Sequence, residues 1–181
     1  GQMDIQEAIQ AISGDKANYN MFIRDDYLSK NEAWGILLDM SSSLKPFSVT
    51  TKELALCLAE VAKELMAGEG NWGLYAFSNK FVVVKDIGEE YSANVKARIG
   101  GLSKGGLSYI PDALQLGAQI LTSAGRDHNY LFVISDGIPA GYPEIEAKLE
   151  ATIKKLTQGG LIIIAVGIGS NGLQKYLRNT Y

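Results

Sequence analysis

The stretch DMSSS, residues 39–43, places an aspartate and three hydroxyl side chains directly after the apolar run at residues 34–38. Ser41 and Ser43 are two residues apart, a spacing that directs both hydroxyls to the side of Asp39 in an extended or turning loop. Carboxylate and hydroxyl oxygens are hard ligands, which suit Mg²⁺, Mn²⁺ or Ca²⁺ better than zinc or copper. The stretch therefore predicts one part of a divalent-cation site.

Two further segments bring oxygen side chains to the ends of predicted elements. Asp136 follows the apolar run at residues 130–134, and Ser108 lies in the glycine-rich segment 105–111, just before a predicted helix. Each also has an ordinary structural interpretation, because aspartate and serine at such positions commonly cap helices or form turns. A set of two acids and three hydroxyls, without histidine or cysteine, nevertheless favours a hard cation. The predicted metal ligands are Asp39, Ser41, Ser43, Ser108 and Asp136.

Short apolar runs alternate with helical patterns along the chain. Four runs are predicted to be buried strands, at residues 35–38, 73–77, 130–134 and 161–166. A fifth run, residues 81–84, follows a tight turn and is predicted to be an antiparallel edge strand. Helices are predicted at residues 47–66, 110–121 and 143–158. This order predicts an open α/β sheet, mostly parallel and doubly wound in a Rossmann-like manner, with helices on both faces.

The first of these helices carries a stripe of large apolar residues at spacings of four, three and four. The stripe predicts the face that packs on the sheet, and it consists of Leu54, Leu58, Val61 and Leu65. Cys57, the one cysteine, is predicted to be buried and has no partner for an internal disulfide.

Length and composition limit the classes of partner. The 181 residues fit one compact domain, residues 31–181, and residues 1–30 are predicted to be a helical extension without a strand, or the end of a preceding domain. The net charge of −3 argues against a nucleic-acid partner or an anionic membrane surface. The longest apolar run, residues 161–166, is far shorter than the ~20 residues that a membrane-spanning helix needs.

The oxygen residues resemble the metal-ion-dependent adhesion site of von Willebrand factor A (vWA) domains. That site combines Asp-x-Ser-x-Ser with a threonine on a second loop and an aspartate after a later strand. DMSSS matches the first part, Ser108 in GGLSYIPDAL stands at the threonine position, and ISDG supplies Asp136. The resemblance extends over residues 33–178 and implies a vWA fold with a non-enzymatic role in protein–protein interaction.

The same resemblance implies the kind of partner. The family's role is adhesion to proteins or ligands through that metal, and because the predicted oxygens leave the shell of the ion incomplete, we expect an Asp or Glu of a second protein to complete it. The chain lacks a disulfide framework and in this resembles the intracellular members of the family. Those members often act with AAA+ ATPases of the MoxR type in complex assembly or metal insertion. By this resemblance we expect a cytoplasmic interaction module with bound Mg²⁺, or with Mn²⁺ or Ca²⁺ in its place.

Two other functions remain open at this point. Residues 167–172 spell GxGxxG after a predicted strand, but the dinucleotide fingerprint also needs a following helix, a strand and an acid ~20 positions on. A Mg²⁺-dependent phosphoryl-transfer enzyme or receiver-like domain would use Asp39 as the nucleophile. That chemistry needs a second acid beside the first and a lysine in the crevice, for which Lys104 is the nearest candidate.

Overall fold

The computed structural model describes residues 2–3, 22–23, 31–66, 71–170 and 172–177. The chain divides into two compact units, Gly1–Asn31 and Glu32–Tyr181. In the first unit, β1 (Gln2–Met3) and β2 (Phe22–Ile23) pair antiparallel, so the prediction that this region holds no strand is wrong. The helical pattern predicted there lies outside the described residues, and its assignment as an extension stays a prediction.

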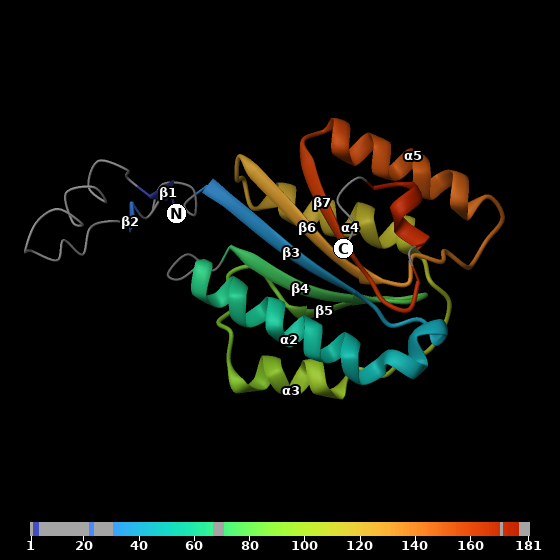
Figure 1. Ribbon diagram of the computed structural model, residues 1–181, viewed down its shortest axis with the longest axis horizontal. Coiled ribbons are helices and arrows are strands. Elements are labelled where there is room, and N and C mark those ends of the chain that lie inside the picture. The colour runs from blue at the N-terminus through green and yellow to red at the C-terminus, as the bar shows by residue number, and fades with distance from the viewer. Residues whose placement is uncertain (1, 4–21, 24–30, 67–70, 171, 178–181) are drawn as a thin grey trace, which may run out of the picture. The chain divides into compact units, whose positions relative to one another are not determined.

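A five-stranded sheet in the order β5-β4-β3-β6-β7 forms the centre of the second unit (Figure 1). Four strands run parallel, and the edge strand β5 pairs antiparallel with β4. This arrangement confirms the predicted α/β sheet with one antiparallel edge. The strands are β3 (Glu32–Asp39), β4 (Trp72–Phe77), β5 (Phe81–Lys85), β6 (His128–Ser135) and β7 (Leu161–Gly167).

Helices cover both faces of this sheet, and each face has its own apolar core (Figure 1). One core lies under α2 (Ser48–Leu65) and α3 (Ala93–Gly101), and the other lies under α4 (Ile110–Ser123) and α5 (Ile145–Gln158). The sequence does not predict α3, because only Val95 and Ile99 of this short helix are buried. Helix α5 begins two residues after Pro143, since Glu144 has a left-handed backbone conformation with φ 61°.

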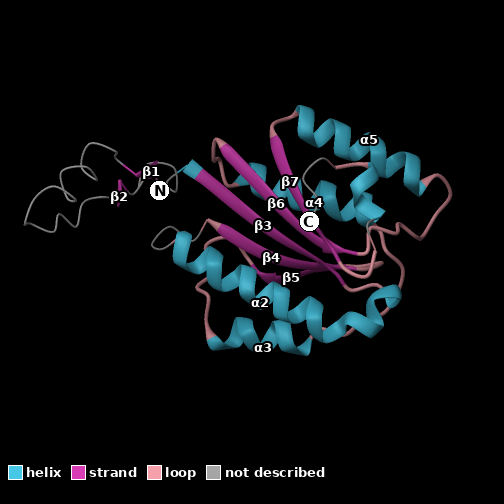
Figure 2. Ribbon diagram, in the orientation of Figure 1, coloured by secondary structure: helices cyan, strands magenta, loops and turns pink. Residues whose placement is uncertain are grey.

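The strand order reverses next to β3, which lies between β4 and β6. The chain leaves β3 toward one edge of the sheet and returns on the other side of β3 as β6. Leu38 pairs with Ile134, so the carboxyl ends of both strands lie at the same level. Figure 2 shows that the loops leaving these strand ends gather at one end of the sheet. In open α/β sheets this is where ligands bind.

Helix α2 packs on the sheet through small side chains. Val61 and Leu65 are 46% and 55% exposed, so the predicted inward stripe is wrong for these two residues, and Cys57 is exposed as well. Small side chains let the helix lie close to the strands, a requirement that hydrophobicity alone does not express. The buried residues of the helix are Thr51, Ala55, Ala59 and Ala62.

Close packing of α2 predicts a clear penalty for a larger side chain. Ala59 is fully buried, and Ala59→Leu is expected to destabilise the domain by about 1–3 kcal/mol because the helix must move away from the sheet. The exposed Val61→Ala serves as the control and should change the free energy of unfolding by less than about 0.5 kcal/mol. Urea unfolding measures both. Equal effects at the two positions would contradict the observed orientation of the helix.

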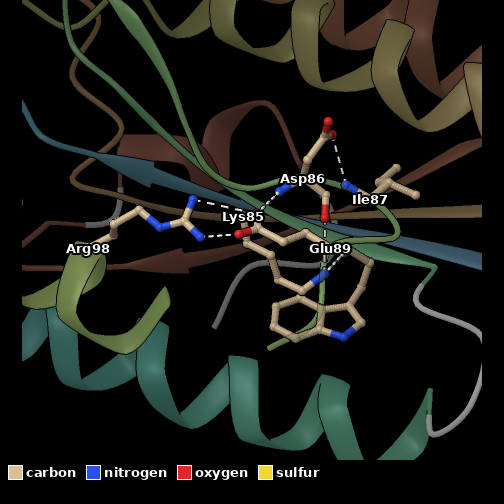
Figure 3. A network of polar contacts seen from close by, with 6 residues as sticks. Lys85, Asp86, Ile87, Glu89 and Arg98 are labelled. Atoms are coloured by element: carbon tan, nitrogen blue, oxygen red, sulfur yellow. Dashed lines mark hydrogen bonds and ion pairs between the residues drawn. The ribbon is translucent and has the colours of Figure 1, made fainter. Parts of the chain in front are cut away.

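Edge strand β5 is fastened to β4 by a buried lysine (Figure 3). Lys85 is 1% exposed, and its ammonium donates to the main-chain oxygens of Trp72 at 2.7 Å and Asp86 at 3.1 Å. The same ammonium lies 4.1 Å from the centre of the Trp72 ring. Burial lowers the pKa of Lys85 to about 8, although Glu89 and Asp86 favour its charged form. Glu89 in turn pairs with Arg98 of α3, which joins this strand end to the helix.

This pKa predicts a pH-dependent stability. The unfolded chain keeps the Lys85 proton up to a pKa of about 10.4, so between about pH 8 and 10 it binds more protons than the folded chain. The free energy of unfolding of the native protein should therefore rise with pH relative to that of Lys85→Met. After allowance for screening, about 1 kcal/mol is expected between pH ~7 and ~9.5. The exposed Lys80→Met should follow the native profile, and parallel profiles for all three proteins would contradict the assignment.

Candidate metal site

Asp39 is the last residue of β3 and is completely buried. Its Oδ1 accepts a hydrogen bond from the main-chain N–H of Ser41 at 2.8 Å. Its Oδ2 accepts from the hydroxyls of Ser108 at 2.8 Å and Ser135 at 2.7 Å. These three donors come from the loop after β3, the loop before α4 and the end of β6, and they satisfy a carboxylate that would otherwise be costly to bury. Asp39 is therefore held in one orientation at the carboxyl end of the sheet.

The two predicted hydroxyls of the DMSSS segment converge beside Asp39. Ser41 and Ser43 lie with their Oγ atoms 3.0 Å apart, as their spacing predicts. The segment is not an extended loop, because a 3₁₀ helix, η2 (Ser42–Phe47), begins directly after Ser41. Ser41 is only 2% exposed, whereas Ser43 is exposed, so one hydroxyl faces the interior and the other faces the solvent side of the crevice.

The loop before α4 is tied to the DMSSS segment through the main chain. Gly105 N–H donates to Met40 O at 2.7 Å, and Ser42 N–H donates to Gly106 O at 3.0 Å. Gly106 has φ 84°, and a Cβ there would lie 2.4 Å from Asn79 Oδ1 in the β4–β5 turn. The positive φ favours glycine at this position, while the exposed Asn79 side chain could move aside. The approach brings Ser108 to Asp39, as predicted from the sequence.

Asp136 follows β6 and is 6% exposed, with Oδ1 accepting from the N–H of Ile138 at 3.1 Å. Its neighbour Ser135 donates to Asp39 and accepts from the N–H of Gly137 at 2.9 Å, so one hydroxyl joins the loops of both acids. Ser135 is absent from the predicted site residues. The signal that could have found it is its position at the end of a strand that adjoins the strand of Asp39.

The GxGxxG segment after β7 supports the loop of Asp136. The Ser170 hydroxyl donates to the main-chain oxygen of Asp136. A Cβ at Gly172 would lie 2.6 Å from that same oxygen, so glycine is required where the two loops meet. The segment leads into η3 (Gly172–Lys175), a single 3₁₀ turn, and not into the helix of a dinucleotide site. The glycines thus serve packing next to the site.

Lys104 places a positive charge in the same crevice. Its ammonium donates to the main-chain oxygen of Asp39 and, at 3.2 Å, to the hydroxyl of Thr51 in α2. Partial burial lowers the pKa of Lys104 to about 8, while Asp39 and Asp136 favour its charged form and Lys52 opposes it. Both carboxylates therefore lie within electrostatic reach of this one ammonium.

The donor set of the crevice fits a hard divalent cation. All five predicted ligand residues belong to the loops at the carboxyl ends of β3 and β6 or at the start of α4. Across the described part of the chain, no three histidine, cysteine or acidic side chains gather as they would at a zinc site. Hydroxyl and carboxylate oxygens remain, and they are the ligands that Mg²⁺, Mn²⁺ and Ca²⁺ prefer. Their role as metal ligands stays a prediction.

An open, mostly parallel sheet with hydroxyl and carboxylate side chains gathered at its switch point defines the class of domain. Residues 35–180 match the family model of the von Willebrand factor type A domain. The chain belongs to this family, as its sequence motifs predict.

Solved structures with the same fold extend the comparison. Manganese-loaded TRAP protein of Plasmodium vivax aligns with a TM-score of 0.64 and 17% identity, over 83% of this chain and 62% of that one. A von Willebrand factor type A protein from Catenulispora acidiphila aligns with a TM-score of 0.60 and 22% identity, over 77% of this chain and 33% of that one. The pilus adhesin SpaC of Lactobacillus rhamnosus GG, in its open conformation, aligns with a TM-score of 0.62 and 16% identity, over 77% of this chain and 24% of that one. The chain thus spans less than two thirds of each of these proteins.

No curated protein sequence matches the chain. Within the described residues, none of the helices combines the length and the apolar character that crossing a membrane requires.

From the hydrogen bonds to Asp39 we predict that the stability of the domain depends on the Ser135 hydroxyl. Ser135→Ala removes one of two hydroxyl donors to a buried carboxylate oxygen and should destabilise the domain by about 1.5–3 kcal/mol. The matched control is Ser42→Ala, an exposed serine of the neighbouring loop, which should change stability by less than about 0.5 kcal/mol. Thermal and urea unfolding report both values. A neutral Ser135→Ala would show that Asp39 does not depend on this bond.

Proposed function

We propose that this domain binds a divalent cation, Mg²⁺ in the first place and Mn²⁺ or Ca²⁺ as alternatives, and that the cation holds a carboxylate of a partner protein. The observation that carries the proposal is the bond between the Ser108 hydroxyl and the Asp39 carboxylate, which joins residues 69 positions apart in one buried crevice. A hydroxyl and an acid brought together from separate loops have the chemistry of a hard-cation site.

Each residue would have a distinct part in holding the cation. Asp39 and Asp136 would supply the negative charge, and the hydroxyls of Ser41, Ser43 and Ser108 would supply neutral oxygens. When bound, the cation supplies an electrophilic centre that an external carboxylate can reach. Five protein ligands would fill five of the six coordination positions of the ion, and the sixth position would be open to the carboxylate of a partner protein.

Proteins of similar fold support this function by their own descriptions. The Plasmodium vivax TRAP structure is manganese-loaded, and SpaC is a pilus adhesin. Both descriptions apply to those proteins, whose identity to this chain is below 20%. They favour a metal-dependent interaction module over an enzyme for this domain.

Phosphoryl transfer through Asp39 is the weaker alternative. That chemistry needs a second acid beside the nucleophile, but the neighbours of Asp39 are the apolar residues Leu38 and Met40. Lys104 is the lysine that such a site needs, but its ammonium donates to a main-chain oxygen and to Thr51. Turnover of p-nitrophenyl phosphate that disappears in Asp39→Asn would restore this alternative.

The particular partner and compartment are a further part of the proposal. We propose a cytoplasmic partner that presents an exposed Asp or Glu, with an AAA+ ATPase of the MoxR type as the first candidate. The resemblance to intracellular vWA proteins supports this choice. Co-purification of the two proteins that is unchanged by EDTA would contradict a metal-bridged complex.

Direct titration tests the metal site. The native protein is expected to bind Mg²⁺ and Mn²⁺ in calorimetry, and saturating metal should raise its melting temperature because only the folded state binds. Ser43→Ala should weaken binding by about 10–100-fold, a range typical of changes close to a metal. The fold should survive, because Ser43 is exposed and, within the described part of the chain, its side chain bonds to the Ser41 hydroxyl.

Asp136→Asn is the matched test on the second loop, and Asp112→Asn is its control. Asp112 is an acid near the start of α4 that bonds to Tyr142 and Lys148 and is not assigned to the metal. Asp136→Asn should weaken metal binding, and Asp112→Asn should leave the dissociation constant unchanged. Equal metal binding by the native protein, Ser43→Ala and Asp136→Asn would refute the site.

A further inference from the structure

Helices α2 and α3 cover only part of their face of the sheet. The core beneath them takes buried side chains from β3, β4 and β5, but within the described residues it takes Ile134 alone from β6 and none from β7. On the opposite face, both strands contribute to the core under α4 and α5. Figure 1 shows α2 and α3 gathered beside β4 and β5, at the far side of the sheet from β7. The α2 face of β6 and β7 is therefore left without a covering helix among the described elements.

This uncovered half of the face carries apolar side chains in matching rows. Side chains alternate between the two faces of a strand, and the core under α4 and α5 takes alternate residues of both β6 and β7. The intervening residues point to the open face, where Tyr130 pairs with Ile162, and Phe132 pairs with Ile164. All four are half-buried or exposed, and Ile162 reaches 36%. A continuous apolar surface of this kind that is open to solvent is typical of an interaction site.

Helix α2 forms a side wall next to this surface. Lys52 donates to the main-chain oxygen of Gly100 in α3, and Glu60 pairs with Lys96 of the same helix, so one flank of α2 faces α3. At 3.6 residues per turn, the opposite flank, toward β6 and β7, carries the apolar stripe of the helix. The stripe consists of Leu54, Leu58, Val61 and Leu65. We call this wall, together with the floor of Tyr130, Phe132, Ile162 and Ile164, the α2 groove.

The dimensions of the α2 groove match those of one helix. The wall runs from Leu54 to Leu65, which is about 17 Å along the helix axis at ~1.5 Å per residue. The floor is two strands wide, and strands ~4.8 Å apart make it about as broad as a helix, whose diameter is ~10 Å. A helix of about three turns beside α2 would contact the floor and the wall together at the ~8–10 Å axis spacing of packed helices. It would need an apolar residue at every third or fourth position.

The charges beside the α2 groove indicate the polar side of such a helix. Glu53 and Glu64 are exposed on the outer side of α2, next to the apolar wall. Both lysines of α2 lie on the flank toward α3, so they do not balance these acids from the groove side. The start of the floor holds one acid, Glu32, beside one base, His128, so the wall sets the preference for charge. A helix with lysine or arginine on its outer flank is complementary to the wall.

We propose that the α2 groove binds an amphipathic helix of a partner protein, about three turns long, with its apolar stripe against the floor and the wall and a basic flank beside Glu53 and Glu64. In this helix-in-groove mode of recognition, apolar anchors supply affinity and the flanking charges favour one orientation. The α2 groove lies on the face of the sheet, whereas the candidate metal site lies at the carboxyl ends of the strands. Binding at the groove therefore needs no cation, and the domain would have two separate interaction surfaces.

Cys57 provides a position for a probe of this surface. It is exposed on α2 about one turn before Val61, and the chain has no other cysteine. An environment-sensitive fluorophore on Cys57 of the native chain should show a saturable change when a synthetic peptide occupies the groove. The peptide has about 14 residues, with leucine at every third or fourth position and lysine on one flank. A second peptide has glutamate in place of each lysine. Titrations in EDTA and in Mg²⁺ should give the same dissociation constant, and calorimetry with unlabelled protein checks it.

Variants of the floor and the wall test the location. Ile162→Ser and Leu65→Ser should each weaken binding of the lysine peptide by about tenfold or more, because a large apolar side chain is lost from the interface. The matched control is Val83→Ser, since Val83 is 48% exposed on β5 at the other edge of the sheet, and it should change the dissociation constant by less than about twofold. Circular dichroism and the melting temperature show that each variant is folded. Leu65 is 55% exposed, so Leu65→Ser keeps the test available if Ile162→Ser does not fold.

The two peptides test the charge preference. The glutamate peptide should bind the native protein about tenfold more weakly than the lysine peptide at ~50 mM salt, and the difference should shrink at ~0.5 M salt because the charges are screened. Equal binding of both peptides at low salt, or a preference for the glutamate peptide, would overturn the basic flank.

Three results would overturn the groove itself as a site for a partner helix. One is the absence of saturable binding of the lysine peptide to the native protein. Another is equal binding by the native protein, Ile162→Ser and Leu65→Ser. The third comes from sedimentation: a native dimer that becomes monomeric in both variants would mean that a second copy of this chain occupies the groove.

Discussion

A carboxylate that is completely removed from water must be hydrogen-bonded, and the whole crevice is arranged around this constraint at Asp39. No single loop could supply all the donors. The N–H of Ser41 and the hydroxyl of Ser108 come from two loops, and the hydroxyl of Ser135 comes from the end of β6; each bond fixes its segment against the end of β3. The interactions that satisfy Asp39 therefore also bring the other oxygen residues together.

The remaining loops support this arrangement without contacting Asp39's carboxylate. Ser170 and Gly172 hold the loop of Asp136 through close main-chain contact. Lys104 joins the DMSSS segment to α2 and supplies a positive charge that partly balances the two acids.

Much of this domain follows from patterns along the chain. The four parallel strands of the large sheet were predictable, because a buried parallel strand is a short, continuous apolar run bounded by polar or glycine residues. The antiparallel edge strand β5 was predictable from the tight turn that precedes it. The meeting of Asp39 with Ser108 was also predictable, since both precede or follow elements at the carboxyl end of one sheet. Helix α3 was not, because two buried residues give too weak a periodic signal.

The sequence by itself determined the alternation of strands and helices, the family and the types of oxygen residue that reach the crevice. The tertiary structure alone decided which face of α2 is buried. That face carries alanines and not the larger apolar residues, because helix and sheet must approach closely. It also decided that Ser135 and Lys104 belong to the site. The partners that give each residue its role lie on strands, loops and helices distant in the chain, so these bonds cannot be read from the neighbouring residues.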